Sequence, residues 1–119
     1  MNLSILESLL KWNCNTSIAM NRFLGDEGLY ISCLRMFSED ENFEALKAAL
    51  AYHDYAMAFD FAHALKGVAS NLELTPLYQA LYELVESLRK DETTFLSERL
   101  AVVSQKWDEF QLLLRNASD

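Results

Sequence analysis

Turn-forming residues are scarce in this chain, and that scarcity restricts its fold more than any other feature. The 119 residues include 3 Gly and 1 Pro. A sandwich or barrel of short strands needs many tight turns, and those turns usually take Gly or Pro. Hydrophobic residues make up 51% and charged residues 24%, which is typical of a globular chain rather than a disordered one. The sequence therefore predicts one all-α domain over residues 1–119.

Apolar spacing divides this domain into helical segments. We expect short helices within about 2–24, and longer ones over about 26–52 with a break near 40, 55–71, 75–90 and 93–115. The last segment has apolar residues spaced alternately four and three apart, as in a bundle helix: Leu96, Leu100, Val103, Trp107, Phe110 and Leu114. Short connections make successive helices antiparallel, which predicts an up-down-up-down four-helix bundle over about 26–115 with short N-terminal capping helices.

Several residues are expected to mark where the helices begin and which way they face. Asp26, Asp54 and Thr75 are plausible N-caps, and Pro76 suits the first helical position because its missing N–H costs nothing there. In the first short helix we expect one apolar face made by Leu3, Leu6 and Leu10.

The charge balance excludes two classes of partner. The chain has 10 Lys and Arg against 18 Asp and Glu, for a net charge of −8. Nucleic acids and anionic membranes are bound through clustered cations, so we expect neither as a partner. The N-terminus lacks the basic region of a signal peptide, and no apolar run approaches the roughly 18 residues of a membrane span. We therefore expect a cytoplasmic protein.

The two cysteines suggest neither a disulfide framework nor a metal site. Cys33 falls within an apolar helical pattern, so we expect a buried reduced thiol there. Neither Cys14 nor Cys33 belongs to a Cys/His cluster with zinc-binding spacing. The sequence thus predicts no metal in this chain.

One segment, 58–72, has an outward face with a histidine and a glycine that the packing of a bundle helix does not require. On a helical wheel its apolar residues cluster on one side, which is the expected core side: Ala58, Phe61, Ala62, Leu65, Val68, Ala69 and Leu72. His63 falls roughly 160° from the centre of that cluster and so faces outward. Phe59 and Lys66 fall on one flank of this outward face, and the face itself holds Asp60, Gly67, Ser70 and Asn71.

The outward face combines a nucleophile, a cation and a gap. Imidazole can act as a neutral nucleophile at pH 7 and can form a high-energy N–P bond with a phosphoryl group. Lys66, one helical turn from His63 and expected to be exposed, would offset the phosphoryl charge. Gly67 costs about 0.8–1 kcal/mol in mid-helix relative to Ala, but it leaves bare backbone where a second protein can approach.

This segment resembles the histidine-containing phosphotransfer (HPt) domains of two-component phosphorelays. The resemblance rests on Ala62-His63-Ala64-Leu65-Lys66-Gly67, followed by Asn71-Leu72 and Leu77. The family pattern is roughly A-H-x-L-K-G-x-x-x-N-[ILV]-G with a leucine four residues later. A looser resemblance covers about 26–115, because the family is itself a four-helix up-and-down bundle.

The resemblance implies a phosphocarrier rather than an enzyme with its own turnover. His63 would be phosphorylated, Lys66 would steady the phosphoryl group and Gly67 would give access. The partners would be a response-regulator receiver domain and a sensor or hybrid histidine kinase. This chain would need no cofactor, because the transfer aspartate and Mg²⁺ belong to the receiver. Phe59, Ser70 and Asn71 are candidates for contact with the partner.

Two positions depart from the family pattern. The glycine after Asn-[ILV] is Glu73 here, so we expect the following turn to differ. The family often has Glu or Gln twenty-two residues after the histidine to hydrogen-bond the imidazole, whereas this chain has Val85. Tyr82 or Gln79 are candidates to replace it.

The residues leave two other functions open. One is a helical-bundle interaction module that binds receiver or kinase domains without being phosphorylated, which Val85 favours. The other is a His-dependent phosphatase or transferase, which a single helix-borne histidine without a second acid or base supports only weakly.

Overall fold

The computed structural model describes residues 2–118 and is entirely helical over that range, with no strand. These residues form α1 (Ile5–Lys11), α2 (Thr16–Arg22), α3 (Glu27–Ser38), α4 (Asn42–Ala51), α5 (Tyr55–Asn71), α6 (Thr75–Arg89) and α7 (Leu96–Asn116). The prediction of an all-α fold is therefore confirmed. No helix within residues 2–118 combines the length and apolar character needed to cross a membrane.

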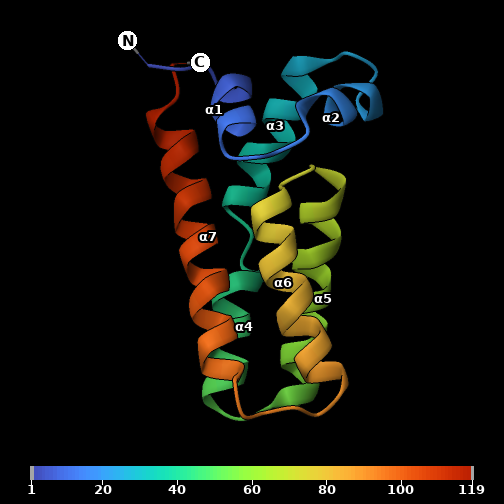
Figure 1. The fold of residues 1–119 in the computed structure, drawn as a ribbon, viewed down its shortest axis with the longest axis vertical. Coiled ribbons are helices and arrows are strands. Elements are labelled where there is room, and N and C mark those ends of the chain that lie inside the picture. Colours follow the sequence, from blue (N-terminus) through green and yellow to red (C-terminus); the bar gives the residue numbers. More distant parts are fainter. Residues whose placement is uncertain (1, 119) are drawn as a thin grey trace.

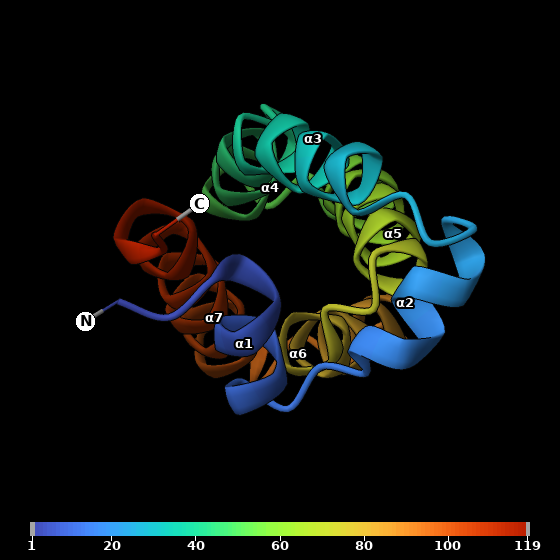
Figure 2. The same ribbon diagram turned by 90° about the horizontal axis from the view of Figure 1, so that it is seen from above.

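The long helices lie lengthwise in a molecule of 42 × 27 × 21 Å, and α1 and α2 lie at one end (Figure 1). Along the chain, α4 packs on α5, α5 on α6 and α6 on α7. Viewed along the long axis, α3 with α4, α5, α6 and α7 surround a common centre (Figure 2). The chain ends meet at one end of the molecule, where the Ser118 N–H donates to the Leu3 carbonyl oxygen at 3.0 Å.

Aromatic side chains join α7 to α3 and α4. The ring of Trp107 is stacked on Phe43 with ring centroids 5.1 Å apart and meets Phe37 edge-on at 5.2 Å. The predicted apolar seam of α7 is confirmed, because five of its six residues are buried and only Leu100 is half-buried. Such pairs contribute packing energy beyond the apolar area they bury.

The predicted break near residue 40 separates α3 from α4. The Asp40 carboxylate accepts a hydrogen bond from the Asn42 N–H at 2.7 Å. From α7, Gln111 Nε2 donates to the Ser38 carbonyl oxygen, also at 2.7 Å. The break between α3 and α4 is therefore stabilised by the Asp40 side chain within it and by Gln111 of the neighbouring helix α7.

The predicted helix starts are partly correct. Asp26 and Asp54 are N-caps, whose carboxylates accept from the N–H groups of Leu29 and Met57.

Thr75 was expected to cap α6, and this is wrong: Leu74 is the N-cap and makes no side-chain cap bond. Thr75 begins the helix itself, and its neighbour Pro76 stands one position later than predicted. Proline is still tolerated there, because the first N–H groups of a helix have no intrahelical partner.

The predicted apolar face of the first helix is wrong. Ile5 and Leu9 are buried, whereas Leu3 and Leu10 are 40% and 63% exposed and Leu6 is half-buried. A capping box, in which Ser4 and Glu7 bond each other's backbone N–H, starts the helix at Ile5. Contact with α7 then decides which face is buried, so the helix turns its Ile5–Leu9 edge inward.

The cysteine prediction is also corrected. Both thiols are free, but Cys14 is the buried one, at 3% exposure, and Cys33 is only half-buried. Burial raises the pKa of the Cys14 thiol to about 11.

Candidate functional site

The candidate site lies on α5, whose observed range, Tyr55–Asn71, is the predicted one. Its buried residues are small or aliphatic: Ala58, Ala62, Leu65 and Ala69. Alanines on this face allow α4 and α6 to pack closely against α5. The opposite face is left to solvent, and Asp60, His63, Gly67, Ser70 and Asn71 are all exposed on it. The predicted division of the helix into core and outward sides is confirmed, although Phe61 and Val68 are only half-buried.

The imidazole of His63 is stacked against the ring of Phe59, one turn earlier in α5. The ring centroids lie 5.6 Å apart and the planes are inclined by only 7°. The Arg89 guanidinium of α6 lies over the Phe59 ring, with its Cζ 5.2 Å from the Phe59 centroid. It is the third planar group in this arrangement. Glu86 Oε1 in turn accepts from Arg89 Nε at 3.2 Å. Phe59 therefore touches both His63 and α6, and it is half-buried.

No hydrogen bond orients the His63 ring within residues 2–118. Val85 is fully buried in the core and has no polar group to offer. The carboxylate of the next residue, Glu86, forms an ion pair with Arg89. The departure of this sequence from the family pattern at Val85 thus corresponds to a missing hydrogen bond, and neither Tyr82 nor Gln79 replaces it.

Lys66 lies against α6 instead of extending freely into solvent. Its Nζ is 5.6 Å from the centroid of the Tyr82 ring, a cation–π contact, and the side chain is half-buried. The expectation that Lys66 is exposed is therefore only partly correct, because the side chain is half-buried. Lys66 forms no ion pair with any residue in the described part of the chain, so its charge is available to an incoming anion.

Open space surrounds Gly67. A Cβ placed on it meets no atom within 4 Å, and the residue is exposed. Internal packing therefore gives no reason for a glycine at this position. What the glycine does provide is bare backbone, one turn beyond His63 on the same helix face.

Ser70 and Asn71 lie at the C-terminal end of α5, and their backbones are tied to α2. Arg22 donates to the carbonyl oxygens of Ser70 and Asn71 at 3.3 and 2.8 Å. Arg22 also pairs with Glu73 at 3.0 Å. The side chains of Ser70 and Asn71 remain exposed at the edge of the His63 face. Sequence reasoning missed Arg22, because nothing local links it to a site about fifty residues away.

The turn after α5 has a backbone conformation that favours glycine, and Glu73 occupies that position. Glu73 has φ +57°, in the left-handed region. The N–H of the next residue, Leu74, bonds back to the Ala69 carbonyl oxygen at 2.9 Å, which closes the end of the helix. Tyr30 adds a buried bond from its hydroxyl to the Leu72 carbonyl oxygen at 2.7 Å. A glutamate thus stands at a position whose backbone conformation glycine adopts more readily.

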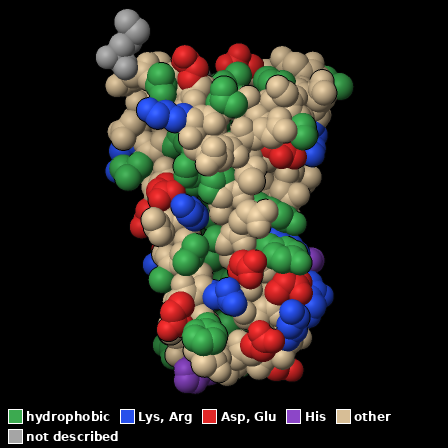
Figure 3. Space-filling view, viewed as in Figure 1, with side chains coloured by type: hydrophobic (Ala, Val, Ile, Leu, Met, Phe, Trp, Pro, Cys, Tyr) green, Lys and Arg blue, Asp and Glu red, His purple; other side chains and the backbone are tan. Residues whose placement is uncertain are grey.

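Side chains of both charge signs lie around the His63 face. Lys66 lies one turn after His63 on α5 and contacts Tyr82, and Arg89 lies over the Phe59 ring that stacks on His63. Figure 3 shows Lys and Arg side chains gathered over the lower part of α5 and α6, with acidic side chains among them. Glu86 pairs with Arg89 and Asp60 is exposed on the His63 face, which leaves Lys66 as the cation beside this face that has no ion pair within the described residues.

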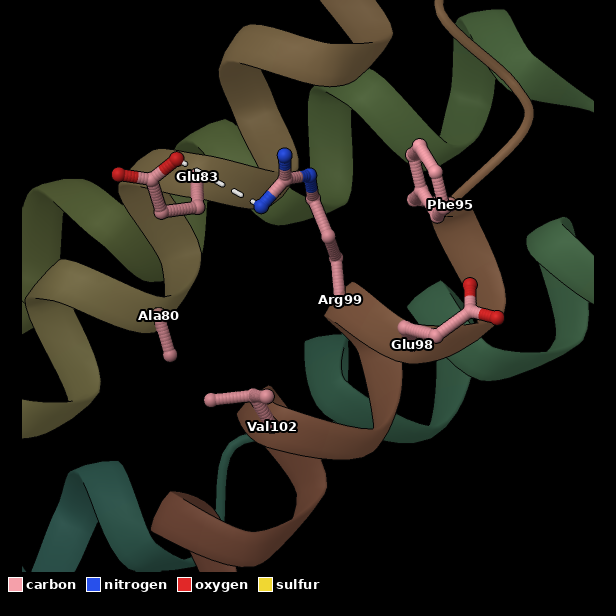
Figure 4. Close-up of a pocket in the computed structure, with 6 residues that line it drawn as sticks. All are labelled: Ala80, Glu83, Phe95, Glu98, Arg99 and Val102. Atoms are coloured by element: carbon pink, nitrogen blue, oxygen red, sulfur yellow. Dashed lines mark ion pairs between the residues drawn. The ribbon is translucent and has the colours of Figure 1, made fainter.

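A separate hollow of about 270 Å³ lies between α6 and α7 (Figure 4). It is lined by Ala80, Glu83, Phe95, Glu98, Arg99 and Val102. Glu83 and Arg99 reach toward one another across it, with an N–O distance of 3.6 Å. None of the predicted site residues lines this hollow. Among residues 2–118, no cluster of three or more His, Cys, Asp and Glu side chains is arranged to hold a metal ion.

Comparisons of the chain with protein-family models, with curated proteins and with solved structures found no match.

Proposed function

We propose that this chain is a phosphocarrier of the HPt type, which accepts a phosphoryl group on His63 and exchanges it with a receiver aspartate. The proposal includes the fold: α3 and α4 together, α5, α6 and α7 correspond to an up-down-up-down four-helix bundle, and α1 and α2 to capping helices. It also includes a cytoplasmic location, where receivers and kinases meet.

One observation carries the proposal. His63 is exposed on the side of α5 opposite its buried stripe, and Gly67 one turn away has nothing within 4 Å of a built Cβ. A phosphoryl carrier needs a nucleophile that another protein's acceptor can reach in line with the P–N bond. An ordinary surface histidine needs no such gap beside it.

The transfer requires little chemistry of this chain. An unprotonated ring nitrogen of His63 attacks the phosphorus of the receiver's aspartyl phosphate. A P–N bond forms, the P–O bond to the aspartyl carboxylate breaks, and that carboxylate leaves with the bonding pair. The reverse reaction passes the group on. Mg²⁺ and the aspartate are the receiver's, so this chain alone has no turnover.

Lys66 would offset charge on the phosphorylated ring. It lies one turn from His63, carries no ion pair within the described residues, and is held near the surface by Tyr82. A cation–π contact on a partly exposed ring is worth about 0.5–1 kcal/mol. A phosphoryl oxygen offers a stronger, charge-assisted bond, so the ammonium would exchange one contact for the other.

The test is transfer from a phosphorylated receiver in the presence of Mg²⁺. We expect acid-labile, base-stable phosphate on this chain, and its loss in His63→Gln. The matched control is His53→Gln, the same change at the only other histidine, which should leave labelling intact. Label that survives His63→Gln would mean that the site is misassigned.

A second candidate function is an interaction module that binds receiver or kinase domains without carrying phosphate. The missing hydrogen bond to the His63 ring favours it, since no protein group within residues 2–118 then fixes which ring nitrogen carries the proton. This module would bind a receiver equally well with His63→Gln and would take no label from several phosphorylated receivers. An enzyme would instead hydrolyse a small phosphate ester over many turnovers.

A further inference from the structure

We propose that Phe59 is the positioning residue for His63, holding the imidazole by stacking where no hydrogen bond does. The inference rests on the proposed function of His63, and it goes beyond the expectation that Phe59 contacts a partner. It assigns an apolar side chain the task of orienting the reactive ring.

The contact between the two rings restricts how the imidazole can turn. Residues four apart in a helix are neighbours on its surface, so the two rings can meet without distorting the backbone. A centroid distance of 5.6 Å with planes inclined by 7° is an offset parallel arrangement, which aromatic pairs prefer over a direct sandwich. Contact through the ring face leaves the ring edge, with both nitrogens, free of protein partners within residues 2–118.

Phe59 can orient its neighbour because its own ring is held. The Arg89 guanidinium lies over the Phe59 ring at 5.2 Å, and Arg89 is fixed in turn by Glu86 at 3.2 Å. Phe59 is half-buried, so part of the ring also packs on the core. The column from His63 through Phe59 to Arg89 thus connects the reactive ring of α5 to α6.

The competing view is that the stack is incidental and that the exposed imidazole samples all its rotamers equally. The two views differ in what a change at Phe59 does to the rate at which His63 reacts. Orientation of a nucleophile lowers the barrier only if the reacting geometry is the one that is held. A stack of this kind corresponds to a change of about two- to tenfold in rate.

The experiment compares Phe59→Leu and Phe59→Tyr in the whole chain. Leu keeps an apolar side chain without a ring face, and Tyr keeps the ring. The matched control is Phe61→Leu, the same loss of a half-buried aromatic two residues away on α5. Circular dichroism first establishes that each variant is helical. Arg89→Gln, at a residue whose side chain is 51% exposed, serves as a second variant should Phe59→Leu not fold.

The first readout is the proton NMR shifts of the His63 ring, which require no phosphorylation. We expect ring-current shifts in wild type and Phe59→Tyr, and their loss in Phe59→Leu. The second readout is the rate of labelling by phosphoramidate, a small donor that needs no partner protein. In that reaction a His63 nitrogen attacks phosphorus, a new P–N bond forms, and the bond to the amine nitrogen breaks to release ammonia.

We expect Phe59→Leu to slow labelling by about two- to tenfold, Phe59→Tyr to restore it and Phe61→Leu to leave it unchanged. Arg89→Gln should slow it by a smaller factor in the same direction. Equal rates and equal ring shifts in wild type and Phe59→Leu would overturn the inference while leaving the proposed function intact. If wild-type His63 takes no label from either phosphoramidate or a receiver, the proposed function fails first, and the inference with it.

Discussion

Arg22 of α2 and Glu73, in the turn after α5, are joined by an ion pair of 3.0 Å. Glu73 has φ +57°, a conformation that costs a side-chain-bearing residue about 1 kcal/mol. Arg22 also bonds two carbonyl oxygens at the end of the same helix. The arginine therefore compensates a strained position and anchors the end of the helix that carries His63.

We expect the effect of Glu73→Gly to depend on Arg22. In wild type, relief of the strained φ and loss of a partly exposed ion pair nearly cancel, so the free energy of unfolding changes by less than about 0.5 kcal/mol. In an Arg22→Ala background, where the pair is already gone, Glu73→Gly should stabilise by about 1 kcal/mol. Urea unfolding of the four proteins measures this cycle. Destabilisation by Glu73→Gly in both backgrounds would contradict the compensation.

Alkaline pH should destabilise the fold through Cys14. Burial raises its pKa from 9.0 to about 11, so the folded chain holds the thiol proton more tightly than the unfolded chain does. This contribution is complete below pH 9 and is lost as the pH rises toward 11. Burial also raises the pKa of Tyr30, whose effect has the same sign.

Unfolding free energies measured between pH 8 and 11 should therefore fall for wild type and fall less steeply for Cys14→Ala. Comparing slopes removes the constant cost of the cavity that alanine leaves. Parallel curves for wild type and Cys14→Ala would count against this role of the buried thiol.

The sequence predicted α5 well because one signal dominates it. A strongly apolar stripe at helical spacing leaves one possible core side, and everything opposite, including His63 and Gly67, must face solvent. The stack of Phe59 on His63 was also within reach of sequence reasoning, because residues four apart on a helix are neighbours.

Sequence reasoning misplaced the buried face of α1 and missed two pairs because these depend on contacts between distant parts of the chain. In α1 the apolar residues allow two faces, and contact with α7 selects one: Trp12 Nε1 donates to Glu109 Oε1 at 2.9 Å and its ring stacks on Phe110. Arg22 with Glu73, and Arg89 over Phe59, likewise join separate helices. Local periodicity contains no information about such pairs.

Lys66→Ala should weaken phosphoryl transfer more than it weakens the fold. Loss of the contact with Tyr82 should reduce the free energy of unfolding by about 0.5–1 kcal/mol. Loss of the charge beside a phosphorylated His63 should slow transfer, or speed loss of the phosphoryl group, by on the order of tenfold. Lys90→Ala, at an exposed lysine just after α6, is the control and should change neither. An unfolding loss without any kinetic effect would reduce Lys66 to a structural residue.

Substitutions at Gly67 can distinguish an effect on a receiver's access to His63 from an effect on the free energy of unfolding. Since nothing lies within 4 Å of a built Cβ, the fold should accept a side chain there. Gly67→Ala and Gly67→Gln should both raise the unfolding free energy, by up to about 1 kcal/mol, because glycine is the poorer helix former.

The two variants should differ in function. Gly67→Gln places a long side chain one turn from His63, so a receiver can no longer approach and transfer should fall well below that of Gly67→Ala. Labelling by phosphoramidate, which is small, should survive in both variants. Thermal melts together with the two labelling assays measure all three effects. Gly67 is not an access position if Gly67→Gln melts higher and still exchanges phosphate with the receiver at the wild-type rate.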